Sequence, residues 1–142
     1  MTLLSNTLLP NTLSVGIWAM MVACILPFAW SAVAKMMGGF TNQDNSNPRE
    51  FLANLTGLPA RANAAQANSF ETLPMFLAGV LVAMYCFVPQ ALVNTLAWLY
   101  VIIRVGYGVA YLLNLATLRS LLWALSMACI GLLFVFALRF VA

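Results

Sequence analysis

The sequence predicts an all-α integral membrane protein with four spanning helices, and two observations carry that prediction. The chain of 142 residues is 64% hydrophobic and 6% charged, with a mean hydropathy of +0.97, a composition outside the range of soluble domains. A spanning helix needs about 20 mostly apolar residues. Four stretches qualify, and a single transmembrane domain over 1–142 is expected, with helices at about 13–36, 60–88, 91–113 and 118–141.

The first apolar stretch, Leu13 to Met36, is predicted to be a retained helix. No basic segment and no small-residue cleavage site accompany it, and it is too long for the core of a signal peptide. Gly38 and Gly39 end it, and the Asn, Asp, Ser and Pro residues that follow are typical of a loop. Within this loop, "NPREFLANLTGLPARA" predicts a short interfacial helix. The second spanning helix is expected to begin near Pro59, because proline is favoured in the first turn.

The second and third helices are predicted to be antiparallel neighbours, because only the short turn at 88–90 separates them. Their depths can then be compared at about 1.5 Å of rise per residue. Measured from the turn, Glu71 is expected to be level with Tyr107, and Asn68 with Tyr111. The polar residues of the two helices are therefore expected to face one another.

The distribution of charge predicts the orientation in the membrane. Lys35, Arg49 and Arg61 lie between the first two helices, and Arg119 opens the fourth helix on the same side. Only Arg139 lies near the opposite boundary. The positive-inside rule therefore places the long first loop in the cytoplasm and both termini outside.

Neither a metal site nor a disulfide is expected. Cys24, Cys86 and Cys129 lie in three different helices, without a CxxC pair and without any histidine in the chain. We interpret them as small core residues. In a membrane protein the distribution of charge is more informative than the net charge of +3. No nucleic-acid partner is expected.

Polar side chains recur on one face of the second helix and on one face of the third. On the second helix they are Arg61, Asn68 and Glu71, with Met75 on the same face, and on the third they are Tyr100, Arg104, Tyr107, Tyr111 and Asn114. Spacings of three, four and seven residues stack side chains on one helix face. An ionisable side chain exposed to lipid costs roughly 3 kcal/mol or more, so such faces turn toward the bundle, a cavity or a subunit interface. The two faces are expected to converge on one site in the cytoplasmic half.

A structural alternative exists for part of this pattern. Glu71 and Arg104 would form a buried ion pair, with Asn68 as a hydrogen-bonding partner that locks the two helices together. The second polar face and the additional Arg119 favour a binding site over a lone ion pair. Tyr100 is interpreted separately, as a membrane anchor or a packing residue.

Three motifs resemble those of the MAPEG family, the membrane-associated proteins in eicosanoid and glutathione metabolism. They are "RANAAQANSFETLPMF", "RVGYGVAY" and "TLRSLLW", and the resemblance spans nearly the whole chain. It implies a left-handed four-helix bundle that assembles as a homotrimer and binds glutathione between subunits near the cytoplasmic face. The short form resembles bacterial members, which implies a bacterial inner membrane.

The resemblance also implies which residues form the site. The positions that fall where family members contact glutathione, or just before that motif, are Arg61, Gln66, Asn68, Glu71, Arg104, Tyr107 and Tyr111. Arg119 lies near the arginine thought to activate the thiol in the leukotriene-forming branch, so Arg104 and Arg119 are the catalytic candidates. That branch has an arginine where this chain has Ala64 and an acidic residue where it has Ala60, which argues against a direct leukotriene synthase.

The function implied by the resemblance is a glutathione-dependent transferase or peroxidase. Its co-substrate would be a hydrophobic electrophile or lipid hydroperoxide that enters from the bilayer. The alternative is a non-catalytic protein of the same fold that binds lipid or presents it to a partner. Arg104 and Arg119 favour catalysis, whereas Ala64 favours the alternative. A small transporter is disfavoured, because the sequence has no inverted repeat and no broken helix pair.

Overall fold

The computed structural model describes residues 10–141, and its elements are all helical. The four long helices are α1 (Leu13–Gly38), α3 (Gly57–Tyr85), α4 (Gln90–Leu112) and α5 (Ala116–Val141). Between α1 and α3 lie the short η1 (Asp44–Ser46) and α2 (Pro48–Ala53). All four long helices are apolar enough to cross a membrane. The predicted all-α membrane class is confirmed.

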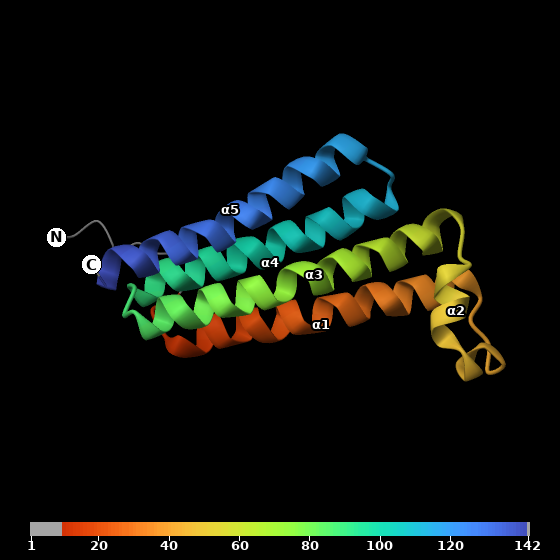
Figure 1. The fold of residues 1–142 in the computed structure, drawn as a ribbon, viewed down its shortest axis with the longest axis horizontal. Coiled ribbons are helices and arrows are strands. Elements are labelled where there is room, and N and C mark those ends of the chain that lie inside the picture. The colour runs from red at the N-terminus through yellow and green to blue at the C-terminus, as the bar shows by residue number, and fades with distance from the viewer. Residues whose placement is uncertain (1–9, 142) are drawn as a thin grey trace.

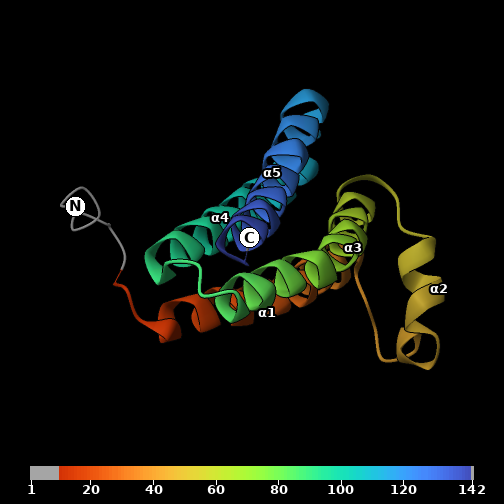
Figure 2. The same cartoon turned by 60° about the vertical axis from the view of Figure 1, so that its left-hand side comes forward.

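The central pair of the bundle is formed by α3 and α4. The outer helices α1 and α5 each pack against both of them, and successive long helices run in opposite directions (Figure 1). The beginning of α1 and the end of α5 lie at one end of the bundle, and α2 lies at the other. Toward the α2 end, α5 leans away from α3, and Figure 2 shows α2 to the side of the bundle, beyond the ends of α1 and α3.

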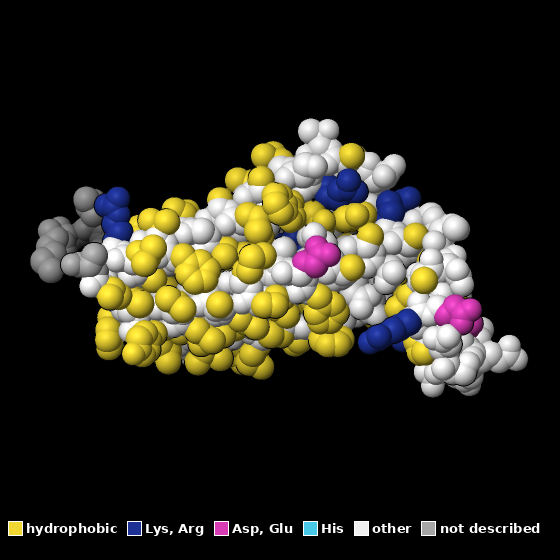
Figure 3. All heavy atoms as spheres, viewed as in Figure 1, with side chains coloured by type: hydrophobic (Ala, Val, Ile, Leu, Met, Phe, Trp, Pro, Cys, Tyr) yellow, Lys and Arg dark blue, Asp and Glu magenta, His cyan; other side chains and the backbone are white. Residues whose placement is uncertain are grey.

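Small residues allow the helices of the core to approach closely, as is usual in membrane bundles. The fully buried side chains of the central cluster include Ala19, Phe76, Val80, Ala83, Val93, Ala97 and Leu133. Large hydrophobic side chains cover the outside. In Figure 3 they extend along the bundle, and basic side chains gather mainly toward the end that carries α2.

The helix ends follow from residues that adopt positive φ. Gly39 closes α1 with φ of +75°, and its N–H bonds to the carbonyl of Lys35, as in a left-handed helix cap. Phe87 and Asn114 have φ of +57° and +59° in the next two connections. The helix α3 therefore stops before the predicted end at 88, because Phe87 has already left the helical conformation.

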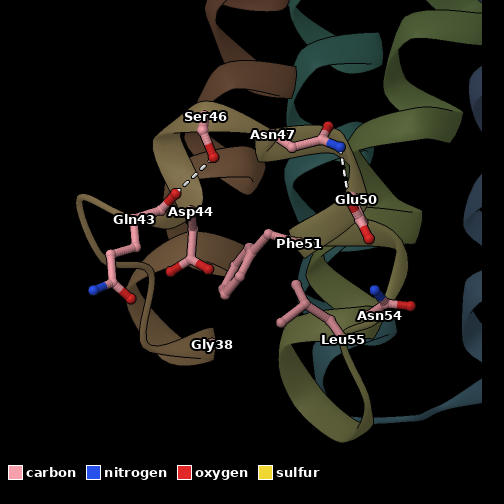
Figure 4. A pocket seen from close by; sticks show the side chains of 9 residues that line it. All are labelled: Gly38, Gln43, Asp44, Ser46, Asn47, Glu50, Phe51, Asn54 and Leu55. Carbon is pink, nitrogen blue, oxygen red and sulfur yellow. Dashed lines mark hydrogen bonds between the residues drawn. The ribbon is translucent and has the colours of Figure 1, made fainter.

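The loop between α1 and α3 folds back on the end of α1. A Cβ added to Gly38 would lie 2.6 Å from Cδ2 of Leu55 and 3.1 Å from Cζ of Phe51, so these side chains pack closely on the glycine. The backbone N–H and hydroxyl of Thr41 both donate to the Asp44 carboxylate, which lowers the pKa of Asp44. Figure 4 shows the resulting pocket of about 480 Å³, lined mainly by polar side chains.

The outer helix α1 is fixed to α4 at two levels. Near the beginning of α1, the buried amide of Asn94 donates to the carbonyls of Pro10 and Thr12 at 2.9 and 3.0 Å. Further along, the indole of Trp30 lies directly on the backbone of Gly108, where an added Cβ would be 2.0 Å from Cζ2. Because Gly108 follows Tyr107 in sequence, the second contact also positions the helix turn that carries the candidate site.

Candidate functional site

A polar network crosses the interface between α3 and α4 at Arg104, which is 1% exposed. Its Nη1 donates to Oδ1 of Asn68 at 3.0 Å, and its Nη2 donates to Oγ of Ser69 at 3.1 Å. Asn68 in turn donates from Nδ2 to Oε2 of Glu71 at 3.0 Å. One amide therefore links the arginine to the glutamate.

A buried ion pair between Glu71 and Arg104, the structural alternative, is wrong. Glu71 is exposed on the single chain, and Asn68 bridges its carboxylate to the arginine. Glu71 also lies at the midpoint of α3. A charged side chain exposed to lipid at such depth costs roughly 3 kcal/mol, so this face is expected to be covered by a cavity wall or by another subunit.

Two tyrosines extend the network from Arg104 to Arg119. The guanidinium carbon of Arg104 lies 4.2 Å from the ring centroid of Tyr107. The rings of Tyr107 and Tyr111 meet edge to face with centroids 5.6 Å apart, and Arg119 lies 4.4 Å from the Tyr111 centroid. Cation–π contacts of this kind hold a guanidinium in place without neutralising its charge.

The two arginines have different surroundings. Arg119 is half-buried and lines a cleft of about 160 Å³ together with Tyr107, Ser120 and Trp123. Arg104 is held inside the bundle, and its Nε is buried without a hydrogen-bond partner among residues 10–141. Arg119 can therefore contact an anionic group in the open cleft. Arg104 instead contacts Asn68, Ser69 and Tyr107 behind the cleft and can hold these side chains in place.

The predicted depth matching of the two helices is wrong. Asn68 contacts Arg104 rather than Tyr111, and one turn further along α3 the hydroxyls of Thr72 and Tyr100 lie 2.9 Å apart. The prediction extended both helices to the turn, whereas α3 ends at Tyr85. Because the connecting residues add no helical rise, the earlier end of α3 moves the facing positions on α4 about three residues toward the turn and accounts for part of the difference.

Two of the predicted site residues lie outside the network. Arg61 donates from Nε to the carbonyl of Leu112 at 3.0 Å, at the C-terminal end of α4, where the helix dipole favours a cation. The Oε1 of Gln66 is buried and has no hydrogen-bond partner in the part of the chain that the structure describes. The residues that the structure does bring together are Asn68, Glu71, Arg104, Tyr107, Tyr111 and Arg119.

Sequence reasoning missed Ser69, Ser120 and Trp123. Ser69 could have been found from its hydroxyl, because the buried face of α3 on which it lies is otherwise mostly apolar. The buried residues of this helix are Ala62, Ala65, Ser69, Thr72, Phe76, Gly79, Val80 and Ala83, and a hydroxyl on such a face needs a partner. Tyr100 is a packing residue, since its buried ring stacks on Phe76 with centroids 4.0 Å apart.

These observations define a multi-pass membrane protein of the four-helix class, with an arginine–tyrosine network that reaches an open cleft. Residues 15–139 match the MAPEG family, so the chain belongs to the MAPEG family, and the resemblance of the motifs is confirmed. No match was found among curated proteins or solved structures. Membership supports a role in membrane glutathione chemistry or lipid metabolism, and family members generally use glutathione.

Proposed function

We propose that this protein is a glutathione-dependent transferase or peroxidase that acts on hydrophobic electrophiles or lipid hydroperoxides. The observation that carries the proposal is the series of contacts from Arg104 through two tyrosines to Arg119, which lines the open cleft. A thiol with a pKa near 8.5 is mostly protonated at neutral pH, whereas the thiolate is the nucleophile. A neighbouring cation raises the thiolate fraction, and one pKa unit corresponds to about 1.4 kcal/mol.

The chemical groups at the site suit an anionic tripeptide. The exposed carboxylate of Glu71 can accept from the α-amino group, while Asn68 and the tyrosines orient the peptide amides and carboxylates. Arg119 then stabilises the thiolate in the cleft, and Arg61 borders the site.

We further propose that a second copy of the chain completes the site. The cleft of about 160 Å³ is smaller than the roughly 300–1,000 Å³ of ligand pockets, and Glu71 needs cover at its depth. A homotrimer, typical of the family, would meet both requirements, with glutathione held between neighbouring subunits. Phe70 and Met75, both exposed beside Glu71, would add apolar contact.

The proposed reaction uses the thiolate in one of two ways. With an electrophilic carbon, sulfur forms a C–S bond while the leaving group departs with its electron pair. With a hydroperoxide, sulfur attacks the terminal oxygen, the O–O bond breaks, and the lipid alcohol leaves with a proton. The resulting sulfenic acid reacts with a second glutathione to give the disulfide and water. The apolar co-substrate arrives from the bilayer, which the hydrophobic outer surface contacts.

The direct test is titration of the purified protein in detergent with glutathione. We expect an ultraviolet thiolate absorbance at neutral pH and conjugation of a hydrophobic aryl halide. S-methylglutathione, which has no ionisable thiol, should bind without this absorbance. Neither binding nor absorbance with glutathione would contradict the proposal, and binding without absorbance would support the non-catalytic alternative.

For the orientation, we propose that the loop carrying η1 and α2 is cytoplasmic and both termini are outside, in a bacterial inner membrane. Lys35, Arg49, Arg61 and Arg119 on one side against Arg139 on the other support this orientation. In a cysteine-free background, Asn45→Cys in η1 should react with an impermeant thiol reagent only after the membrane is opened. Thr12→Cys, at the opposite end of α1, should react in intact cells, and the reverse result would invert the topology.

A further inference from the structure

We propose that Ser69 is a positioning residue for Arg104 and thereby sets the affinity for glutathione, an inference that rests on the proposed function. Ser69 is 3% exposed and lies in α3 beside Asn68. Its Oγ donates to the carbonyl of Ala65 at 2.8 Å and accepts from Nη2 of Arg104 at 3.1 Å. Because the single hydroxyl proton is used by Ala65, the oxygen lone pairs remain for the arginine.

The two acceptors on α3 hold Arg104 without neutralising it. Asn68 accepts a hydrogen bond from Nη1 and Ser69 accepts one from Nη2, and both acceptors are uncharged. Asn68 also bridges to the Glu71 carboxylate, so the arginine has no direct contact with that charge in the network. The positive charge of Arg104 is therefore not cancelled by direct contact with a carboxylate.

Two acceptors also define the plane of the guanidinium, which one acceptor cannot do. The guanidinium carbon lies over the Tyr107 ring, 4.2 Å from its centroid, and Tyr107 lines the cleft with Arg119. Without the hydroxyl, Nη2 would be a buried donor with no partner, an arrangement that proteins avoid. The guanidinium would turn, and both Asn68 and Tyr107 would lose their fixed neighbour.

The test compares Ser69→Ala with Thr72→Val, a matched control on the same helix. Each change removes a buried α3 hydroxyl that bonds to its own helix and to α4, at Arg104 for Ser69 and at Tyr100 for Thr72. We expect Ser69→Ala to raise the Kd and KM for glutathione about tenfold, the low end for a lost hydrogen bond to a charged group. The kcat and the pH profile at saturation should stay close to wild type. Thr72→Val should leave the Kd for glutathione unchanged. Ser69→Thr, which keeps the hydroxyl, should have a Kd close to that of wild type.

A second readout works without glutathione. Nitrogen NMR of labelled arginine reports how freely the Arg104 guanidinium rotates, and we expect faster rotation in Ser69→Ala than in wild type or Thr72→Val. Ser69→Cys, similar in volume but a weak acceptor, serves if the alanine variant does not fold.

The outcomes separate the two proposals. Absence of glutathione binding by wild type defeats the proposed function, while the NMR comparison still tests the role of Ser69. Unchanged rotation in Ser69→Ala overturns the positioning role. An equal rise in Kd for Ser69→Ala and Thr72→Val also overturns it, because the cause would then be looser contact between α3 and α4.

Discussion

Replacing Arg119 with glutamine is expected to leave bound glutathione mostly protonated at neutral pH and to slow conjugation about tenfold to a hundredfold, for a loss of one to two pKa units. Arg119 lines the cleft and stacks on Tyr111, so glutamine keeps hydrogen-bonding capacity but removes the charge. The activity of the variant should rise as the pH approaches the ordinary pKa of the thiol. The measurement is thiolate absorbance and conjugation rate across pH at saturating glutathione.

Two further arginine variants test whether the effect on the thiol is specific to Arg119. Arg139→Gln removes the same charge in the last turn of α5, far along the chain from the site, and should match wild type. Arg104→Gln should weaken binding more than it changes the thiol pKa, since Arg104 is bonded to Asn68 and Ser69 inside the bundle. A wild-type pH profile in Arg119→Gln, with loss of the thiolate in Arg104→Gln, would assign activation to Arg104 instead.

Replacing Gly108 with alanine is expected to destabilise the fold by about 1–3 kcal/mol, the usual cost of overpacking. The new Cβ would lie 2.0, 2.3 and 2.7 Å from Cζ2, Cε2 and Cη2 of Trp30, so α1 and α4 must separate. Because Tyr107 is adjacent, glutathione binding should weaken as well. Thermal unfolding in detergent measures the first effect, and a glutathione titration measures the second.

Gly131→Ala is the matched control, because no other described residue has an atom within 4 Å of an added Cβ there, its own helix backbone aside. It should be neutral or stabilising by roughly 0.5–1 kcal/mol, since alanine favours the helix over glycine. In a double-mutant cycle, Trp30→Leu removes the clashing ring and should recover part of the stability lost in Gly108→Ala. Equal unfolding temperatures for Gly108→Ala and wild type would show that the close approach of α1 to α4 is unimportant.

Periodicity predicted much of the candidate site because helical spacing is a local property. Spacings of three and four residues placed Arg104, Tyr107 and Tyr111 on one face, and the structure links these side chains in that order. The same spacing placed Asn68 beside Glu71, which Asn68 contacts. Periodicity missed Ser69 because its importance lies in a contact with another helix.

Contacts between helices were predicted less well, for a geometric reason. The depth comparison needed the point at which α3 ends, and that point depends on the positive φ of Phe87, which no composition rule indicates. The supposed ion pair failed for a related reason. The register of α3 against α4 brings Asn68, and not Glu71, to Arg104.

Hydropathy and motif were sufficient for the membrane class and the family, because the length of an apolar stretch and the spacing of residues along a helix are encoded locally. The meeting of Asn68 and Ser69 with one buried arginine was decided by the tertiary structure, as was the separation of Arg104 inside the bundle from Arg119 at the cleft. Both depend on where helices end and how α3, α4 and α5 pack together, and that packing is a property of the whole bundle.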